Sequence, residues 1–326
     1  MRRHVFASTL AMLTVVAAFP QADEWGKLMD AGIAAEIAGD YAKASSLYGQ
    51  LTEMSDRLDP HDARRAYAWN SRAKTDDILG RFAEAETGYR HALKAAEESL
   101  GKSNFAYAMV LENLATMYVE TGQAARGEKL SREALAIHCA IEPRNEVRTA
   151  VAQNCLGTIL AMCGKPGESR RLTEAALPVL EKHPEAWMEL AVALNSMGVA
   201  YFADRNYPEA ERVLVKGATL IEQHAGADHP MLIRMLCNLA SVQVRTARRE
   251  EARLTLRRAL NIAETRLGAD HPMYGIVLAS YAGYLRQAGD KSQAKALEAK
   301  SMRIMRDSGR RNGLGAVIDI TALQRK

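Results

Sequence analysis

The chain has 326 residues, of which 48% are hydrophobic, 25% charged and 6% aromatic, and this composition excludes a wholly disordered chain. The scarcity of aromatic residues and the many closely spaced alanines favour helices packed through small side chains over a strand-rich core. The formal net charge is only +4, but residues 231–326 hold 18 basic and 8 acidic side chains, so an acidic first part precedes a basic last third.

Residues 1–22 are typical of a secretory signal peptide. Arg2 and Arg3 precede an uncharged run of about 15 residues, which is shorter than the roughly 20 residues that a membrane-spanning helix needs. Cleavage after Ala18 fits the small-residue preference better than cleavage after Ala22. We expect a periplasmic or secreted protein with no stable membrane insertion after signal cleavage; the alternative is an uncleaved anchor.

A six-residue turn motif, seen for example at residues 80–85, recurs at spacings of 41 or 42 residues. The copies start at Gly39, Gly80, Gly122, Gly164, Arg205, Ala247 and Gly289. Seven residues before each start stands a small residue: Gly32, Ala73, Ala115, Gly157, Gly198, Ala240 and Ala282. Small side chains at fixed points let neighbouring helices approach closely, so this register predicts repeated pairs of helices. We expect repeats at about residues 23–59, 60–101, 102–143, 144–184, 185–228, 229–270 and 271–308.

The pattern within one repeat resembles the tetratricopeptide signature. The best matches are Leu111, Leu114, Ala115 and Tyr118 in one repeat, and Leu194, Met197, Gly198 and Tyr201 in another. Asp76 and Gln243 depart from it, because they occupy the usual tyrosine position, and no repeat has the terminal proline. The long period and the Asp-His-Pro linkers ending at Pro230 and Pro272 resemble the kinesin-light-chain subtype. The resemblance covers residues 23–308 and implies an all-α, right-handed α-solenoid of about seven helix–turn–helix repeats.

No catalytic motif stands out along the chain, so we expect a protein that is not an enzyme and has no cofactor and no metal. The Asp-His-Pro linkers are interpreted as helix caps followed by a first-turn proline, rather than as metal ligands. Four cysteines are present, and their spacing favours buried free thiols over disulfides or zinc. They are Cys139, Cys155, Cys163 and Cys237.

The tetratricopeptide resemblance implies a concave groove, lined by the first helix of each repeat, that takes an extended peptide or a partner helix. One groove column stands three residues before the small position and reads Met29, Asn70, Glu112, Asn154, Asn195, Cys237 and Ala279. An asparagine amide has an acceptor and two donors, so it can clasp a peptide backbone. The alternative is a hydrogen bond between helices of the array. The candidate peptide-binding residues are Asn70, Lys74, Glu112, Asn154, Asn195, Phe202, Arg234 and Arg245.

The groove positions change in character along the chain. The middle is apolar, with Val151, Met162, Val192, Val199 and Phe202. The later part is basic, with Arg234, Arg245 and Arg286. This gradient favours a protein or peptide ligand with an apolar centre and an acidic end. A stripe of arginines between residues 248 and 258 would suit polyanions in general, but base-stacking aromatic residues are absent, so we expect no nucleic acid partner.

The last segment, residues 309–326, leaves the repeat pattern. We expect a flexible basic link followed by an extended stretch at residues 316–323, which is either a cap, a groove plug, a docking strand or a frayed end. The sequence thus predicts an exported protein–protein interaction scaffold that binds an extended segment in its groove. The alternative is a structural or assembly protein that associates through its acidic N-terminal and basic C-terminal ends, with self-association as one form.

Overall fold

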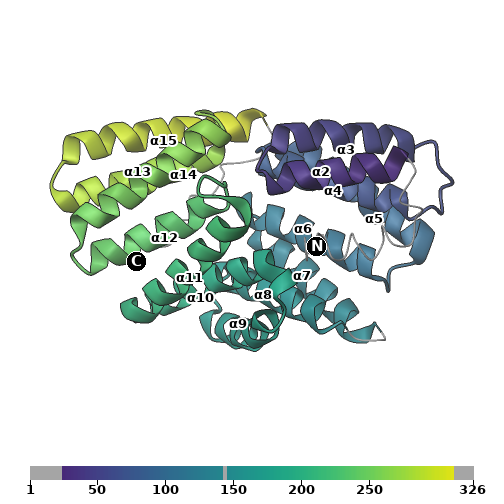
Figure 1. Cartoon of the computed structure of the whole chain (residues 1–326), viewed down its shortest axis with the longest axis horizontal. Coiled ribbons are helices and arrows are strands. Elements are labelled where there is room, and N and C mark those ends of the chain that lie inside the picture. The colour runs from purple at the N-terminus through teal and green to yellow at the C-terminus, as the bar shows by residue number, and fades with distance from the viewer. Residues whose placement is uncertain (1–23, 142–144, 312–326) are drawn as a thin grey trace. The chain divides into compact units, whose positions relative to one another are not determined.

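The computed structural model describes residues 24–141 and 145–311, and this part of the chain is built from paired antiparallel helices (Figure 1). The first helices of the pairs are α2 (Glu24–Ile37), α4 (Arg64–Ile78), α6 (Phe105–Glu120), α8 (Glu146–Met162), α10 (Trp187–Ala203), α12 (Leu232–Arg245) and α14 (Pro272–Ala288). The second helices are α3 (Tyr41–Ser55), α5 (Phe82–Leu100), α7 (Ala124–Ala140), α9 (Pro166–Glu181), α11 (Tyr207–Ala225), α13 (Arg249–Arg266) and α15 (Lys291–Arg311). A short 3₁₀ turn, η1, spans Pro184–Ala186. The predicted all-α solenoid of helix–turn–helix repeats is confirmed.

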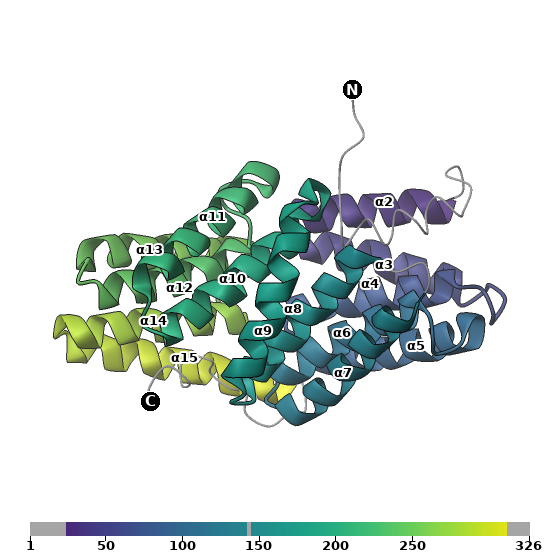
Figure 2. The same cartoon turned by 90° about the horizontal axis from the view of Figure 1, so that it is seen from below.

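The chain divides into two compact units, residues 1–189 and 190–326, and the boundary falls inside α10. In the first unit α4 contacts α6 and α6 contacts α8, while each packs against its own second helix. In the second unit α12 contacts α14, and α13 packs against both (Figure 2). First helices therefore lie next to first helices within each unit, as in a stacked helical repeat.

Each predicted turn start has a left-handed backbone, and this conformation ends the first helix of the pair. Gly39 has a φ of 69°, and its N–H donates to Glu36 O at 2.9 Å while the next N–H, of Asp40, donates to Ala35 O at 2.9 Å. This is the Schellman arrangement that closes a helix C-terminus. Arg205 and Ala247 adopt the same conformation without being glycine, with φ of 61° and 62°. The repeat register therefore overrides the ordinary preference of these two residues.

The small residues before the turns allow the paired helices to touch. A methyl group on Gly32 would lie 2.3 Å from the ring of Tyr48, and one on Gly198 would lie 2.6 Å from Leu214. Both large partners come from the second helix of the same repeat. In these two repeats a large side chain thus lies on bare backbone, and close packing of this kind leaves no room for an added carbon.

Helix starts follow ordinary capping chemistry. Asp40, Asn104 and Asn145 cap α3, α6 and α8 by accepting a hydrogen bond from the backbone N–H three residues on. His271 caps α14 by accepting from Met273 N at 3.0 Å, and a proline occupies the first helical position. The interpretation of the second Asp-His-Pro linker as a helix cap is therefore confirmed.

One expectation on the end segments differs from the structure, and two others are not tested by it. The last helix, α15, runs to Arg311, three residues beyond the expected end of the array at Ser308, so the first residues of the predicted flexible link are helical. A single glycine at position 309 weakens a helix by about 1 kcal/mol but does not break it. The predicted signal peptide and the extended stretch at residues 316–323 lie outside the described residues.

Candidate functional site

Two asparagine pairs connect successive first helices. In the first unit, Asn113 on α6 donates through Nδ2 to Oδ1 of Asn70 on α4 at 3.0 Å. In the second unit, Asn238 on α12 donates in the same way to Asn195 on α10 at 2.8 Å. In both pairs the donor stands 43 residues after the acceptor. The acceptors Asn70 and Asn195 thus form the hydrogen bond between helices that was the alternative to clasping a peptide, and clasping stays a prediction.

The remaining first-unit candidates sit among buried charges. Lys74 forms an ion pair with Glu36, Nζ to Oε2 at 2.9 Å. Glu112 lies 3.3 Å from His138 Nε2 through Oε1. Asn154 is 4% exposed, and its Oδ1 accepts no hydrogen bond from the residues that the structure describes. These three side chains are therefore inside or against the protein, where they support the array more directly than they offer an open surface.

The buried carboxylate of Glu189 lies near the same group of charges. Burial raises its pKa although Arg148 opposes the shift, and no other residue in the described ranges donates a hydrogen bond to either carboxylate oxygen. Burial also lowers the pKa of Arg148, and its guanidinium lies 4.8 Å from the centre of the Phe105 ring. A buried carboxylate whose charge is only partly compensated costs stability.

The clearest open feature lies in the second unit, where Phe202 and Arg245 line one cavity of about 140 Å³. Its walls come mainly from the first helices α10, α12 and α14, with Leu256 from the second helix α13, and include Cys237, Ser241, Ser280 and Gly283. Burial raises the pKa of Cys237 to about 11, so its thiol is neutral at ordinary pH and serves as wall. Phe202 and Arg245, which are 43 residues apart in the sequence and were both predicted as site residues, thus lie at the same cavity.

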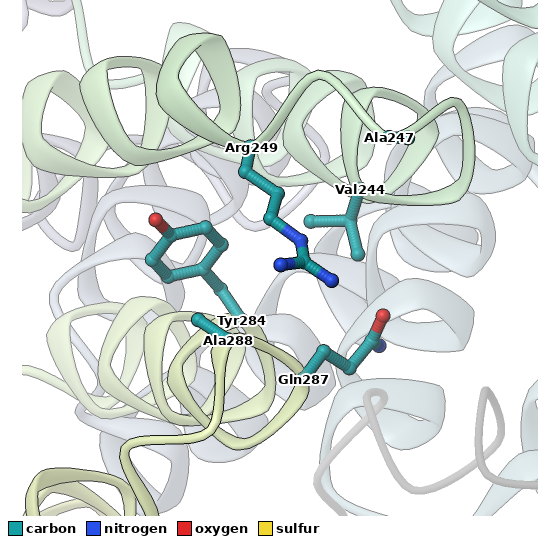
Figure 3. A pocket seen from close by; sticks show the side chains of 6 residues that line it. All are labelled: Val244, Ala247, Arg249, Tyr284, Gln287 and Ala288. Carbon is teal, nitrogen blue, oxygen red and sulfur yellow. The ribbon is translucent and has the colours of Figure 1, made fainter.

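A larger cavity, of about 290 Å³, shares Val244, Tyr284 and Gln287 with the first one. Figure 3 shows the guanidinium of Arg249 reaching from α13 into the space between the ring of Tyr284 and Val244, with Gln287 below it. Neither Arg249, Tyr284 nor Gln287 was among the predicted site residues. Arg249 was visible in the sequence only as one member of the arginine stripe.

Most of that arginine stripe is neutralised locally. Arg248 contacts Glu211 at 2.5 Å, and Arg258 contacts Glu222 at 2.7 Å. Among the residues that the structure describes, Arg245 and Arg249 form no ion pair, and both are exposed. The positive charge that remains available near the cavities therefore belongs to these two side chains. Arg234, another candidate, is half-buried one turn before Asn238.

An apolar surface on α10 leads toward Phe202. Val192 is 47% exposed and Val199 is 40% exposed, and the two lie on one helix face at a spacing of seven residues. Asn195 stands between them on the same helix. Together with the half-buried Phe202, the two valines place apolar surface on the same helix that lines the cavity.

Some functional classes can be compared with the described residues directly. No helix in the described ranges has both the length and the apolar character needed to cross a bilayer. Within residues 24–141 and 145–311, no group of three metal-ligating side chains comes together. All four cysteines are free thiols, and the expectation of burial is wrong for Cys139, which is exposed on α7.

Comparison with known proteins agrees with this architecture. The tetratricopeptide repeat family matches residues 64–140 and 189–265. Protein KINESIN LIGHT CHAIN-RELATED 3 of Arabidopsis thaliana is 23% identical over 264 residues, which cover 68% of this chain; the chain spans about 40% of the length of that relative.

Two solved structures share the fold at low sequence identity. The quorum sensor NprR, solved in complex with its cognate peptide NprX, has a TM-score of 0.60 and 14% identity, with 89% of this chain and 80% of that chain covered. A Rap protein complexed with competence and sporulation factor has a TM-score of 0.57 and 15% identity, with 91% and 99% covered. Residues 64–140 and 189–265 therefore match the tetratricopeptide repeat, the described part of the chain has an α-solenoid fold, and the sequence is similar to kinesin light chain-related proteins.

Proposed function

We propose that this protein is a non-enzymatic interaction scaffold that binds an extended peptide or protein segment along its first helices. The observation that carries the proposal is the open surface of the second unit, where exposed Val192 and Val199 lead to a cavity lined by Phe202 and Arg245. NprR solved in complex with its cognate peptide NprX, and a Rap protein complexed with competence and sporulation factor, are consistent with such a use of the fold.

The chemistry of this surface selects the kind of segment. The two valines and Phe202 favour a partner with apolar side chains, because burying the apolar surface that they still expose gains roughly 25 cal/mol per Å². Arg245 carries an available charge at the same cavity and favours a carboxylate at one end of the segment. A ligand with an apolar centre and an acidic end is therefore the best match.

The test is selection of binders from a random peptide display library with the chain from residue 23 onward as bait. Selected peptides are then measured by fluorescence anisotropy against three variants, Val192→Ser with Val199→Ser, Arg245→Gln, and the control Leu254→Ser. Leu254 is 59% exposed on the second helix α13, so it matches the valines in exposure but not in place. We expect at least tenfold weaker binding for the first two variants and no change for the control. Equal affinity of all three for every selected peptide would exclude this surface as the binding site.

We also propose that the protein is exported to the periplasm or secreted. The support is the composition of residues 1–22, a basic start followed by a short uncharged run and a small-residue cleavage site. Fractionation of cells that express the full chain, with mass measurement of the mature N-terminus, tests this proposal. An unprocessed chain in the cytoplasmic fraction would contradict it.

The alternative scaffold, which associates through its acidic and basic ends, retains one argument, the uneven charge of the chain. The ion pairs of Arg248 and Arg258 weaken that argument, because these charges are already compensated within the second unit. Light scattering at low and high salt separates the two functions, since end-to-end association should give a mass that falls as salt screens the charges.

A further inference from the structure

The cavity of about 290 Å³ is a second feature of the same unit, and its lining combines one charge with polar and apolar walls. Val244 and Ala288 supply apolar atoms, Tyr284 contributes a largely buried ring, and Gln287 contributes a side-chain amide. Arg249 contributes a guanidinium that points into the space between these walls (Figure 3). The volume suits one side chain of moderate size rather than a whole cofactor.

The charge of Arg249 is uncompensated although carboxylates stand next to it in the sequence. Glu250 is held by Arg253 at 2.8 Å, and Glu251 is held by Arg248 at 3.5 Å. Within the described part of the chain, Arg249 itself forms no ion pair. The neighbouring arginines therefore leave Arg249 as a donor for a group that is not part of this unit.

The wall opposite Arg249 agrees with a carboxylate rather than a second cation or a purely apolar group. A guanidinium binds a carboxylate through two parallel N–H···O bonds, and the amide of Gln287 can donate a further one. Val244 and Ala288 can cover the methylene stem that carries the carboxylate. Each part of an acidic side chain thus has a complementary part of the cavity.

We propose that this cavity receives the side chain of a glutamate or aspartate from the bound segment, with Arg249 as the specificity-determining residue. The inference rests on the proposed function, because it names an acidic residue within the segment that the first helices bind. The two adjoining cavities then have different roles. The cavity with Phe202 and Arg245 binds the apolar part of the segment, and the cavity with Arg249 selects an acidic residue next to it.

The experiment uses N-acetylglutamate amide as the probe and N-acetylglutamine amide as the isosteric control, titrated into the ¹⁵N-labelled chain at low salt. We expect saturable NMR shifts of the Arg249 Nε–H and the Gln287 side-chain amide with the glutamate probe, with a Kd of the order of 1–10 mM. Arg249→Gln should weaken this binding at least tenfold. Arg257→Gln is the matched control, since Arg257 is exposed on the same helix and lies outside both cavities.

The outcomes separate the inference from the proposed function. Equal shifts with both probes, no saturable shift up to about 50 mM, or unchanged binding by Arg249→Gln would overturn the assignment of the cavity. If display peptides bind the native chain and keep their preference for an acidic residue in Arg249→Gln, the proposed function stands and this inference fails. If the glutamate probe binds through Arg249 but no peptide is ever selected, the cavity assignment stands and the proposed function fails.

Discussion

The left-handed turn residue Ala247 offers the sharpest test of the repeat register. Its φ is 62°, and its N–H donates to Val244 O at 3.2 Å while the next N–H, of Arg248, donates to Gln243 O at 2.9 Å. The turn is therefore the same C-terminal closure that Gly39 makes at the corresponding position of its own repeat. The change Ala247→Gly removes a Cβ from a backbone conformation that disfavours it.

The magnitude follows from two opposing contributions. A non-glycine residue in the left-handed region costs about 1–2 kcal/mol, and this cost disappears in the variant. Glycine also enlarges the conformational freedom of the unfolded chain, and this lowers the free energy of unfolding by about 0.4–1 kcal/mol. We therefore expect Ala247→Gly to raise the free energy of unfolding by about 0.5–1 kcal/mol.

Urea unfolding followed by circular dichroism measures this change as a higher midpoint. The matched control is Ala299→Gly, an exposed alanine inside α15 of the same unit, which should lower the free energy of unfolding by about 1 kcal/mol. A lower midpoint for Ala247→Gly, similar to that of the control, would show that the backbone at position 247 is not strained and would refute the reasoning.

Three further predictions concern packing, pairing and charge. A methyl group at Gly32 meets a tyrosine ring at 2.3 Å whereas one at Gly49 meets nothing within 4 Å, so Gly32→Ala should lower the melting temperature and Gly49→Ala should raise it; the same sign for both would contradict the packing argument. Removal of the bond between Asn238 and Asn195 should reveal a coupling of about 0.5–1.5 kcal/mol in a double-mutant cycle of alanine variants, and a coupling near zero would mean that the pair adds nothing. Burial raises the pKa of Glu189 above its ordinary 4.5, so the folded state holds this proton more tightly and loses stability as the pH rises from that value through the folded pKa. Glu189→Gln should therefore gain more stability relative to the native chain at pH 7 than at pH 4, measured by urea unfolding, and an equal difference at both pH values would contradict the assignment.

Much of the fold was predictable because every repeat has the same two local requirements. A left-handed residue must end each first helix, and a small residue must lie where the paired helices touch; both needs are visible as recurring residues such as Gly39 and Gly32. Even where Ala247 replaced glycine, its place in the register identified the turn. Local chemistry of this kind leaves a mark in the sequence, because only a few residue types satisfy it.

The candidate site was predictable only in part. The sequence indicated the first helices as the binding surface, and Phe202 and Arg245 do line a common cavity. It could not show that Asn195 would accept a hydrogen bond from Asn238, since the partner of an amide depends on how two helices stack. It also could not separate Arg249, which forms no ion pair among the described residues, from the stripe that contains Arg248, because neutralisation depends on carboxylates brought near by folding.

The sequence by itself therefore determined the repeat, its turns and its close contacts, since each depends on residues within one helical pair. The tertiary structure alone decided which polar groups remain available to a partner. Whether an arginine can bind a partner depends on how the helices stack. Arg248 is neutralised by Glu211 of the neighbouring repeat, whereas Arg249 lines a cavity and stays available. Long side chains reach across repeats, so their partners follow from packing rather than from sequence spacing.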